Sequence, residues 1–151
     1  MSINLVLNSR NSLEYANGVA KFFVNWGQFF DDDPYCRYNV SFSFTTEHDA
    51  NLDQDDIFIV SLDNLGSTMR SITSIGQFGV GSTSSTAIGI VSPFNTTGAH
   101  VRLNSDYSNN PPVEIMGRPS ENILQVSFRD LSNTITAKEP NFLLIIRFEK
   151  I

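Results

Sequence analysis

The chain has 151 residues, a formal net charge of −6 at pH 7 and 40% hydrophobic residues, among them 12 Phe. This length suits one domain built around one hydrophobic core, so we expect a single domain spanning residues 1–151. The acidic balance disfavours a nucleic-acid partner, because affinity for phosphates comes chiefly from clustered Lys and Arg, and the 10 basic residues are scattered.

Two features of the sequence bear on where the protein works. Cys36 is the only cysteine and no charged-then-apolar leader opens the chain, so we expect a reducing compartment. The longest apolar run, residues 142–146, is far shorter than the ~20 residues that span a bilayer. We therefore expect no membrane span.

Apolar residues recur with period two along most of the chain, and this pattern predicts half-buried antiparallel strands. The clearest case is residues 36–45, where apolar and polar residues alternate without a break. In chain order, the predicted strands are Ile3–Leu7, Val19–Trp26, Cys36–Thr45, Ile57–Leu62, Ser71–Phe78, Ala87–Val91, Ala99–Leu103, Val113–Met116, Ile123–Arg129 and Phe142–Phe148.

Turn-forming residues separate these strands, and strong helix formers are scarce. The pair Asn17-Gly18 and the acidic run Asp31–Pro34 are examples, and residues 79–86 predict a Gly- and Ser-rich loop. Short strands at this spacing predict an all-β fold, a single jelly-roll made of a two-sheet antiparallel β-sandwich with about eight strands. An immunoglobulin-like sandwich fits the same pattern.

The sequence predicts no catalytic residues, no cofactor and no enzymatic activity. A Ser or Cys nucleophile needs a nearby base, and the only histidines, His48 and His100, lie at the edges of polar loops. Cys36 falls on the inward face of its predicted strand, where it acts as a small hydrophobe.

An acidic loop at residues 49–56 raises the question of a metal site, since oxygen ligands stand at alternate positions, as at the start of an EF-hand. Gln54 stands where that loop needs Gly, and Val60 stands where it needs a bidentate Glu. We therefore predict no metal site.

The last predicted strand suggests a protein interface. If Phe142, Leu144, Ile146 and Phe148 face the core, then Leu143 and Ile145 lie on the opposite face, where another part of the chain or a partner should cover them. Trp26 and Phe30 belong to an aromatic cluster that we expect to reach the surface. The predicted interface residues are Leu143, Ile145, Trp26 and Phe30.

Both ends of the chain resemble the single jelly-roll minor capsid and penton proteins of large eukaryotic double-stranded DNA viruses and their relatives. The segments that carry the resemblance are residues 4–11 (NLVLNSRN), 118–130 (RPSENILQVSFRD) and 141–149 (NFLLIIRFE). The resemblance implies a non-enzymatic subunit of an icosahedral shell, located in the virion and assembled in the host cytoplasm or nucleus. Its implied partners are other capsid proteins and copies of itself, a pentamer among the possible homo-oligomers. The alternative is a carbohydrate- or receptor-binding β-sandwich module, which would carry aromatic and amide side chains at a loop-end groove.

Overall fold

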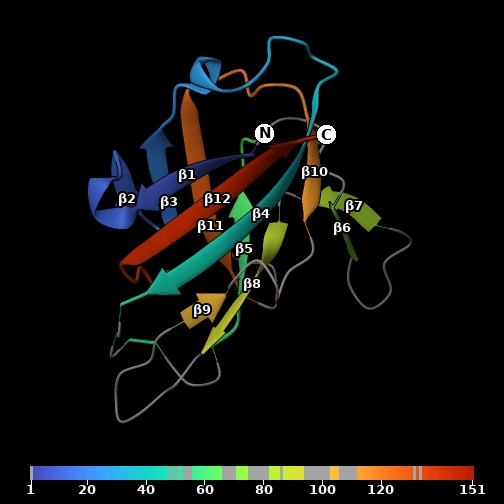
Figure 1. Cartoon of the computed structure of the whole chain (residues 1–151). Coiled ribbons are helices and arrows are strands. Elements are labelled where there is room, and N and C mark those ends of the chain that lie inside the picture. Colours follow the sequence, from blue (N-terminus) through green and yellow to red (C-terminus); the bar gives the residue numbers. More distant parts are fainter. Residues whose placement is uncertain are drawn as a thin grey trace.

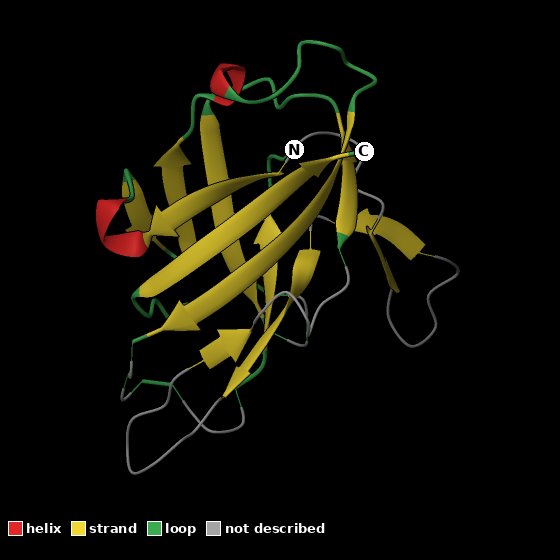
Figure 2. Cartoon of the chain, in the orientation of Figure 1, coloured by secondary structure: helices red, strands yellow, loops and turns green. Residues whose placement is uncertain are grey.

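The computed structural model describes residues 2–47, 49, 51–52, 56–65, 71–74, 82–85, 87–93, 103–105, 112–130, 132 and 134–151. Within this part of the chain the regular structure is almost entirely strand, and the helical segments are two 3₁₀ turns, Ser9–Asn11 and Trp26–Gln28 (Figure 2). No helix in the described residues is long and apolar enough to cross a membrane.

The strands form two antiparallel sheets that face each other (Figure 1). Sheet A contains β1 (Ser2–Asn8), β12 (Phe142–Lys150), β4 (Arg37–Thr46), β9 (Leu103–Ser105) and β10 (Val113–Met116). Sheet B contains β2 (Glu14–Ala16), β3 (Val19–Phe23), β11 (Ile123–Arg129), β5 (Phe58–Leu62) and β8 (Ala87–Pro93). Strand β8 also pairs with β9, which joins the two sheets at one corner. A separate pair consists of β6 (Ser71–Ser74) and β7 (Ser82–Ser85).

The strand order confirms the predicted jelly-roll. In sheet A the strand order is β1-β12-β4, with β10 beside β4, and in sheet B it is β3-β11-β5-β8. The first strand therefore pairs with the last, and the chain crosses repeatedly from one sheet to the other. This is the double Greek-key connectivity of a jelly-roll sandwich, and it brings the two ends of the chain together in one sheet.

Most strands occupy their predicted positions, with a few differences. The strand predicted for Val19–Trp26 ends at Phe23, because the chain turns through the 3₁₀ segment that begins at Trp26. Strand β2 was not predicted, and β7 occupies part of the predicted loop at residues 79–86. The first half of the predicted strand Ser71–Phe78 is β6, and residues 75–78 lie outside the described residues, as does all of the predicted strand Ala99–Leu103 except Leu103.

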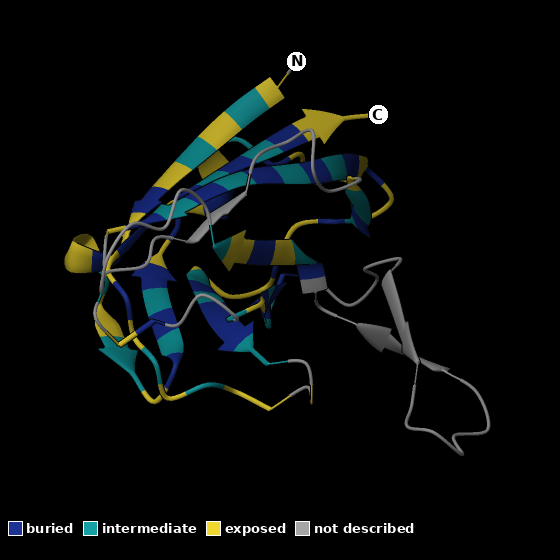
Figure 3. Cartoon of the chain, turned by 90° about the horizontal axis from the view of Figure 1, so that it is seen from below, coloured by how far each residue is buried: buried dark blue, intermediate teal, exposed yellow. Residues whose placement is uncertain are grey.

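The core lies between the sheets and follows the period-two pattern. Burial alternates along β4, where Tyr38, Val40, Phe42 and Phe44 are all buried (Figure 3). On the facing sheet Leu124, Val126 and Phe128 of β11 are buried too, although Ser127 between the last two is also buried. Phe44, Phe128 and Phe142 meet at the centre, with ring centroids 5.2–5.5 Å apart. Large rings contributed by both sheets hold the layers together through apolar burial.

Candidate interaction surface

The outer face of sheet A carries an exposed apolar row. Leu143 and Ile145 alternate with the buried residues of β12 and so point away from the core, as predicted. Val6 lies directly opposite Ile145 in the pairing of β1 with β12. The side chain of Val6 is 59% exposed and that of Leu143 is 37% exposed, while that of Ile145 is half-buried. We call Val6, Leu143 and Ile145 the outer apolar row.

Sequence reasoning missed Val6. In β1, Asn4, Val6 and Asn8 share one face and Ile3, Leu5 and Leu7 share the other, so period-two alternation by itself indicates that Val6 faces away from the core. The structure agrees, since Leu7 lies opposite the buried Leu144 and is itself buried, while Val6 is exposed. An apolar residue on the otherwise polar face of the strand was the available signal.

Small polar side chains border the row on β4. Thr45 lies opposite Leu143, Ser43 lies opposite Ile145, and Ser41 lies opposite Arg147, all on the same outer face. Ser41, Ser43 and Thr45 are all half-buried, and none of them is charged. The apolar row and these short hydroxyl side chains are therefore neighbours on the outer face of sheet A, a composition that suits packing against another protein.

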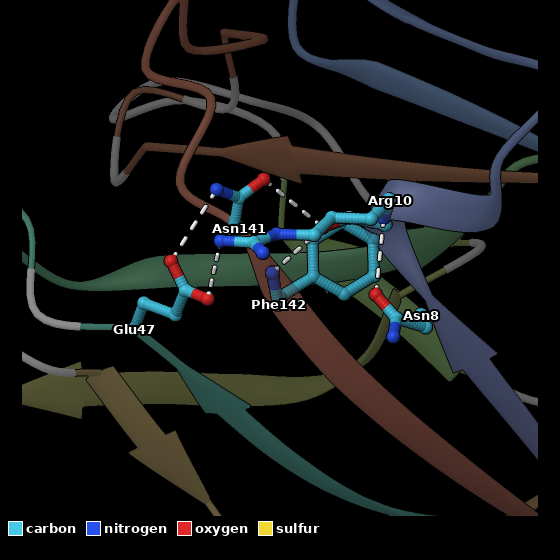
Figure 4. A network of polar contacts seen from close by, with 6 residues as sticks. Asn8, Arg10, Glu47, Asn141 and Phe142 are labelled. Carbon is cyan, nitrogen blue, oxygen red and sulfur yellow. Dashed lines mark hydrogen bonds and ion pairs between the residues drawn. The ribbon is translucent and has the colours of Figure 1, made fainter.

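A polar network closes one end of this surface (Figure 4). Arg10 donates to Glu47 at 2.7 Å, and the Asn141 side-chain amide donates to the other oxygen of Glu47 at 3.4 Å. The backbone N–H of Phe142 donates to the Ser9 hydroxyl at 2.9 Å, which ties the start of β12 to the 3₁₀ turn that follows β1. The network lines a hollow of about 280 Å³ that also touches Leu143. Because Arg10 and Glu47 are exposed, their ion pair adds little to the free energy of folding.

The prediction that Trp26 and Phe30 reach the surface is wrong. Trp26 is 0% exposed and Phe30 is 4% exposed, because the 3₁₀ turn folds their rings back against Phe148 of β12. The indole N–H of Trp26 donates to the carbonyl of Glu121 at 2.8 Å, so its polar atom is satisfied inside the core. In this conformation neither side chain is available to a partner.

A second hollow, of about 460 Å³, lies beside this aromatic cluster, between β1 and the loop after β3. Ile3, Phe29 and Tyr38 line it, and an ion pair of Lys150 with Asp31, 3.0 Å long, stands at its rim. The backbone N–H of Asp33 and the Lys150 ammonium hold the pKa of Asp31 below its ordinary value. Burial raises the pKa of the Tyr38 hydroxyl above its ordinary value.

The residues weighed for catalysis and metal binding do not gather in the described part of the chain. Cys36 is buried, as expected from its inward position. His48 and His100 lie outside the described residues, as do Asp53–Asp55 of the acidic loop. The carboxylate of Asp49 accepts the backbone N–H of Asn51 at 2.8 Å and so stabilises a turn. Across the described ranges no group of three potential metal ligands occurs.

Comparison with known proteins adds no relative. No protein-family profile matches this sequence, and no curated protein matches it at a significant level.

Proposed function

We propose that this chain is a structural subunit of an icosahedral viral capsid, a penton or minor capsid protein, that acts through protein–protein interfaces without catalysis. The observation that carries the proposal is the outer apolar row on sheet A. Val6 and Leu143 are exposed and Ile145 between them is half-buried, so the two paired strands leave apolar side chains accessible side by side, as on surfaces that a partner covers.

The resemblance of the chain to single jelly-roll capsid proteins supports the same role. Two of the resembling segments contain most of β1 and β12, β1 pairs with β12 along the whole length of β1, and the third segment contains β11 in the facing sheet. The residues that carry the resemblance thus form a connected part of the sandwich and include the whole outer apolar row. On this proposal the partners are other shell proteins and further copies of the chain, with a ring of five at a vertex, and the protein is located in the virion.

The test replaces Leu143 with Ser and Ile145 with Thr in one variant. We expect the purified wild-type protein to form a discrete oligomer, and we expect the variant to remain folded but to associate at least tenfold more weakly, because both side chains face away from the core. Sedimentation velocity and native mass spectrometry measure the oligomer, and thermal unfolding checks the fold.

Phe23→Ser is the matched control. Phe23 is 65% exposed on the outer face of sheet B, so this change also removes an exposed apolar side chain, and we expect it to leave assembly unchanged. If the double variant assembles like the wild type, the outer apolar row is not an interface. A wild-type protein that stays monomeric and binds a defined glycan through its loops would instead show a recognition module.

A further inference from the structure

The strands at the margins of the sandwich differ in how their free edges are protected. In sheets A and B, β1, β2 and β10 each pair with a single strand. Strand β2 has only 3 residues and carries Glu14, and β10 has 4 residues and carries Glu114. Short length and charge are the usual means by which proteins prevent unwanted pairing at an edge.

Strand β1 has none of these protections. It has 7 residues, Ser2–Asn8, with no charged residue and no Pro, and its register with β12 runs without a bulge. It lies at the margin of sheet A (Figure 1). Among the described residues, no hydrogen bond other than its ladder with β12 reaches the backbone of β1. As far as the described residues go, every second residue of β1 therefore presents an N–H and a C=O without a partner at the free edge of sheet A.

The side chains next to this edge are also incompletely covered. Ile3 and Leu5 point toward the core side, yet both remain half-buried, whereas Leu7 is buried. Ile3 also lines the hollow beside Phe29 and Tyr38. An added strand would supply both the missing hydrogen bonds and the missing apolar cover for these side chains.

The sequence of β1 is complementary to itself when reversed. In an antiparallel pair of two β1 strands centred on Leu5, the polar Ser2 lies opposite Asn8, the apolar Ile3 lies opposite Leu7, and Leu5 lies opposite itself. Asn4 then lies opposite Val6. All seven residues pair in this register, and core-facing residues meet core-facing residues, as a two-fold axis perpendicular to the sheet requires. An uncharged strand also brings no like charges together.

We infer that β1 is a homodimerisation edge, at which a second copy of this chain adds its own β1 in antiparallel register centred on Leu5. The contact joins two copies of sheet A into one continuous sheet. Among the described strands of sheets A and B, β1 is the one edge of this kind, and an isologous pair of β1 strands closes on itself and does not propagate into a fibre. The contact is smaller than the interfaces of permanent complexes, and the dimer therefore dissociates on dilution. This inference does not rest on the proposed capsid role.

Disulfide trapping tests the register directly, in a Cys36→Ser background. In the pairing centred on Leu5, residue 4 of one copy lies opposite residue 6 of the other, with Cα atoms about 5 Å apart, within disulfide reach. The two copies of residue 6 are about 8 Å apart, which is too far. We therefore expect a mixture of the Asn4→Cys and Val6→Cys proteins to form disulfide-linked heterodimers under mild oxidation, while Val6→Cys alone does not. Efficient linking of Val6→Cys to itself, or no linking in the mixture, would overturn the inferred register.

A second experiment tests the dimer without cysteine. It uses the Leu143→Ser/Ile145→Thr background, so that association through the outer apolar row does not contribute. Sedimentation equilibrium between about 10 µM and about 1 mM, the range in which small interfaces associate, should show a monomer–dimer equilibrium. Adding Ser2→Lys/Asn4→Lys to this background should lower the dimerisation constant at least tenfold, since lysines at an edge oppose strand pairing.

Ser120→Lys/Asn122→Lys is the matched control, with the same change in charge at exposed positions outside β1, and it should leave the dimer intact. A background protein that stays monomeric up to the highest concentration, or a Ser2→Lys/Asn4→Lys protein that dimerises normally, would refute the inference. Neither result would affect the test of the outer apolar row, which is made with β1 unchanged.

Discussion

At the scale of single residues, Gly18 shows how one position fixes a hairpin. Asn17 and Gly18 both have positive φ, 55° and 76°, and connect β2 to β3 with Ala16 opposite Val19. Two central residues with positive φ match the right-handed twist of the flanking strands, as in a type I′ turn. Gly18 also lies against the backbone carbonyl of Thr136, with no space for a Cβ.

We predict that Gly18→Ala lowers the free energy of unfolding by at least about 2 kcal/mol, because the left-handed conformation alone costs an L-residue about 1–2 kcal/mol and the new methyl group meets a backbone oxygen. Urea denaturation measures the loss. Gly27→Ala is the control: its Cβ would have ordinary contacts, the nearest at 3.4 Å, and it should change stability by less than about 0.5 kcal/mol. Equal losses in the two variants would contradict this account of the turn.

At the scale of the strand, alternation predicts the energetic difference between the two faces of an element. Phe128 of β11 is 2% exposed and packs against Phe44 and Phe142 from the opposite sheet. Ser41 of β4 lies on the outer face, where its side chain contributes no core packing.

Phe128→Ala should therefore lower the free energy of unfolding by about 3–5 kcal/mol, the usual cost of removing a buried ring, while Ser41→Ala should cost less than about 0.5 kcal/mol. Chemical denaturation followed by tryptophan fluorescence is a suitable measurement, since Trp26 is fully buried in the native state. A small effect of Phe128→Ala would mean that the sandwich tolerates a cavity at its centre.

At the scale of the whole molecule, the fold should be independent of metal ions. The acidic loop departs from the EF-hand pattern at Gln54 and Val60. One carboxylate oxygen of Asp49 already accepts a hydrogen bond from the backbone N–H of Asn51 within a turn. We expect the melting temperature to stay the same within about one degree on addition of calcium or of a chelator. A rise of several degrees with calcium would contradict this, because a ligand that binds only the native state must stabilise it.

Local sequence patterns are enough to predict the class of fold and, for the strands with the clearest alternation, which face is buried. Period-two alternation over Cys36–Thr45, Ile123–Arg129 and Phe142–Phe148 is a local property, and a strand with one apolar face can bury it in only one way. It also placed Leu143 and Ile145 opposite the core face of β12, where they are found.

Properties that depend on which strands become neighbours are set by the tertiary fold. The pairing of β1 with β12 alone leaves β1 at the margin of sheet A, although its sequence would equally suit a central strand. The 3₁₀ turn at Trp26 buries Trp26 and Phe30, which were predicted to reach the surface. Burial is favoured because contact with Phe148 removes the apolar area of both rings from water. Both outcomes arise from contacts between residues far apart in the chain, which a local pattern does not encode.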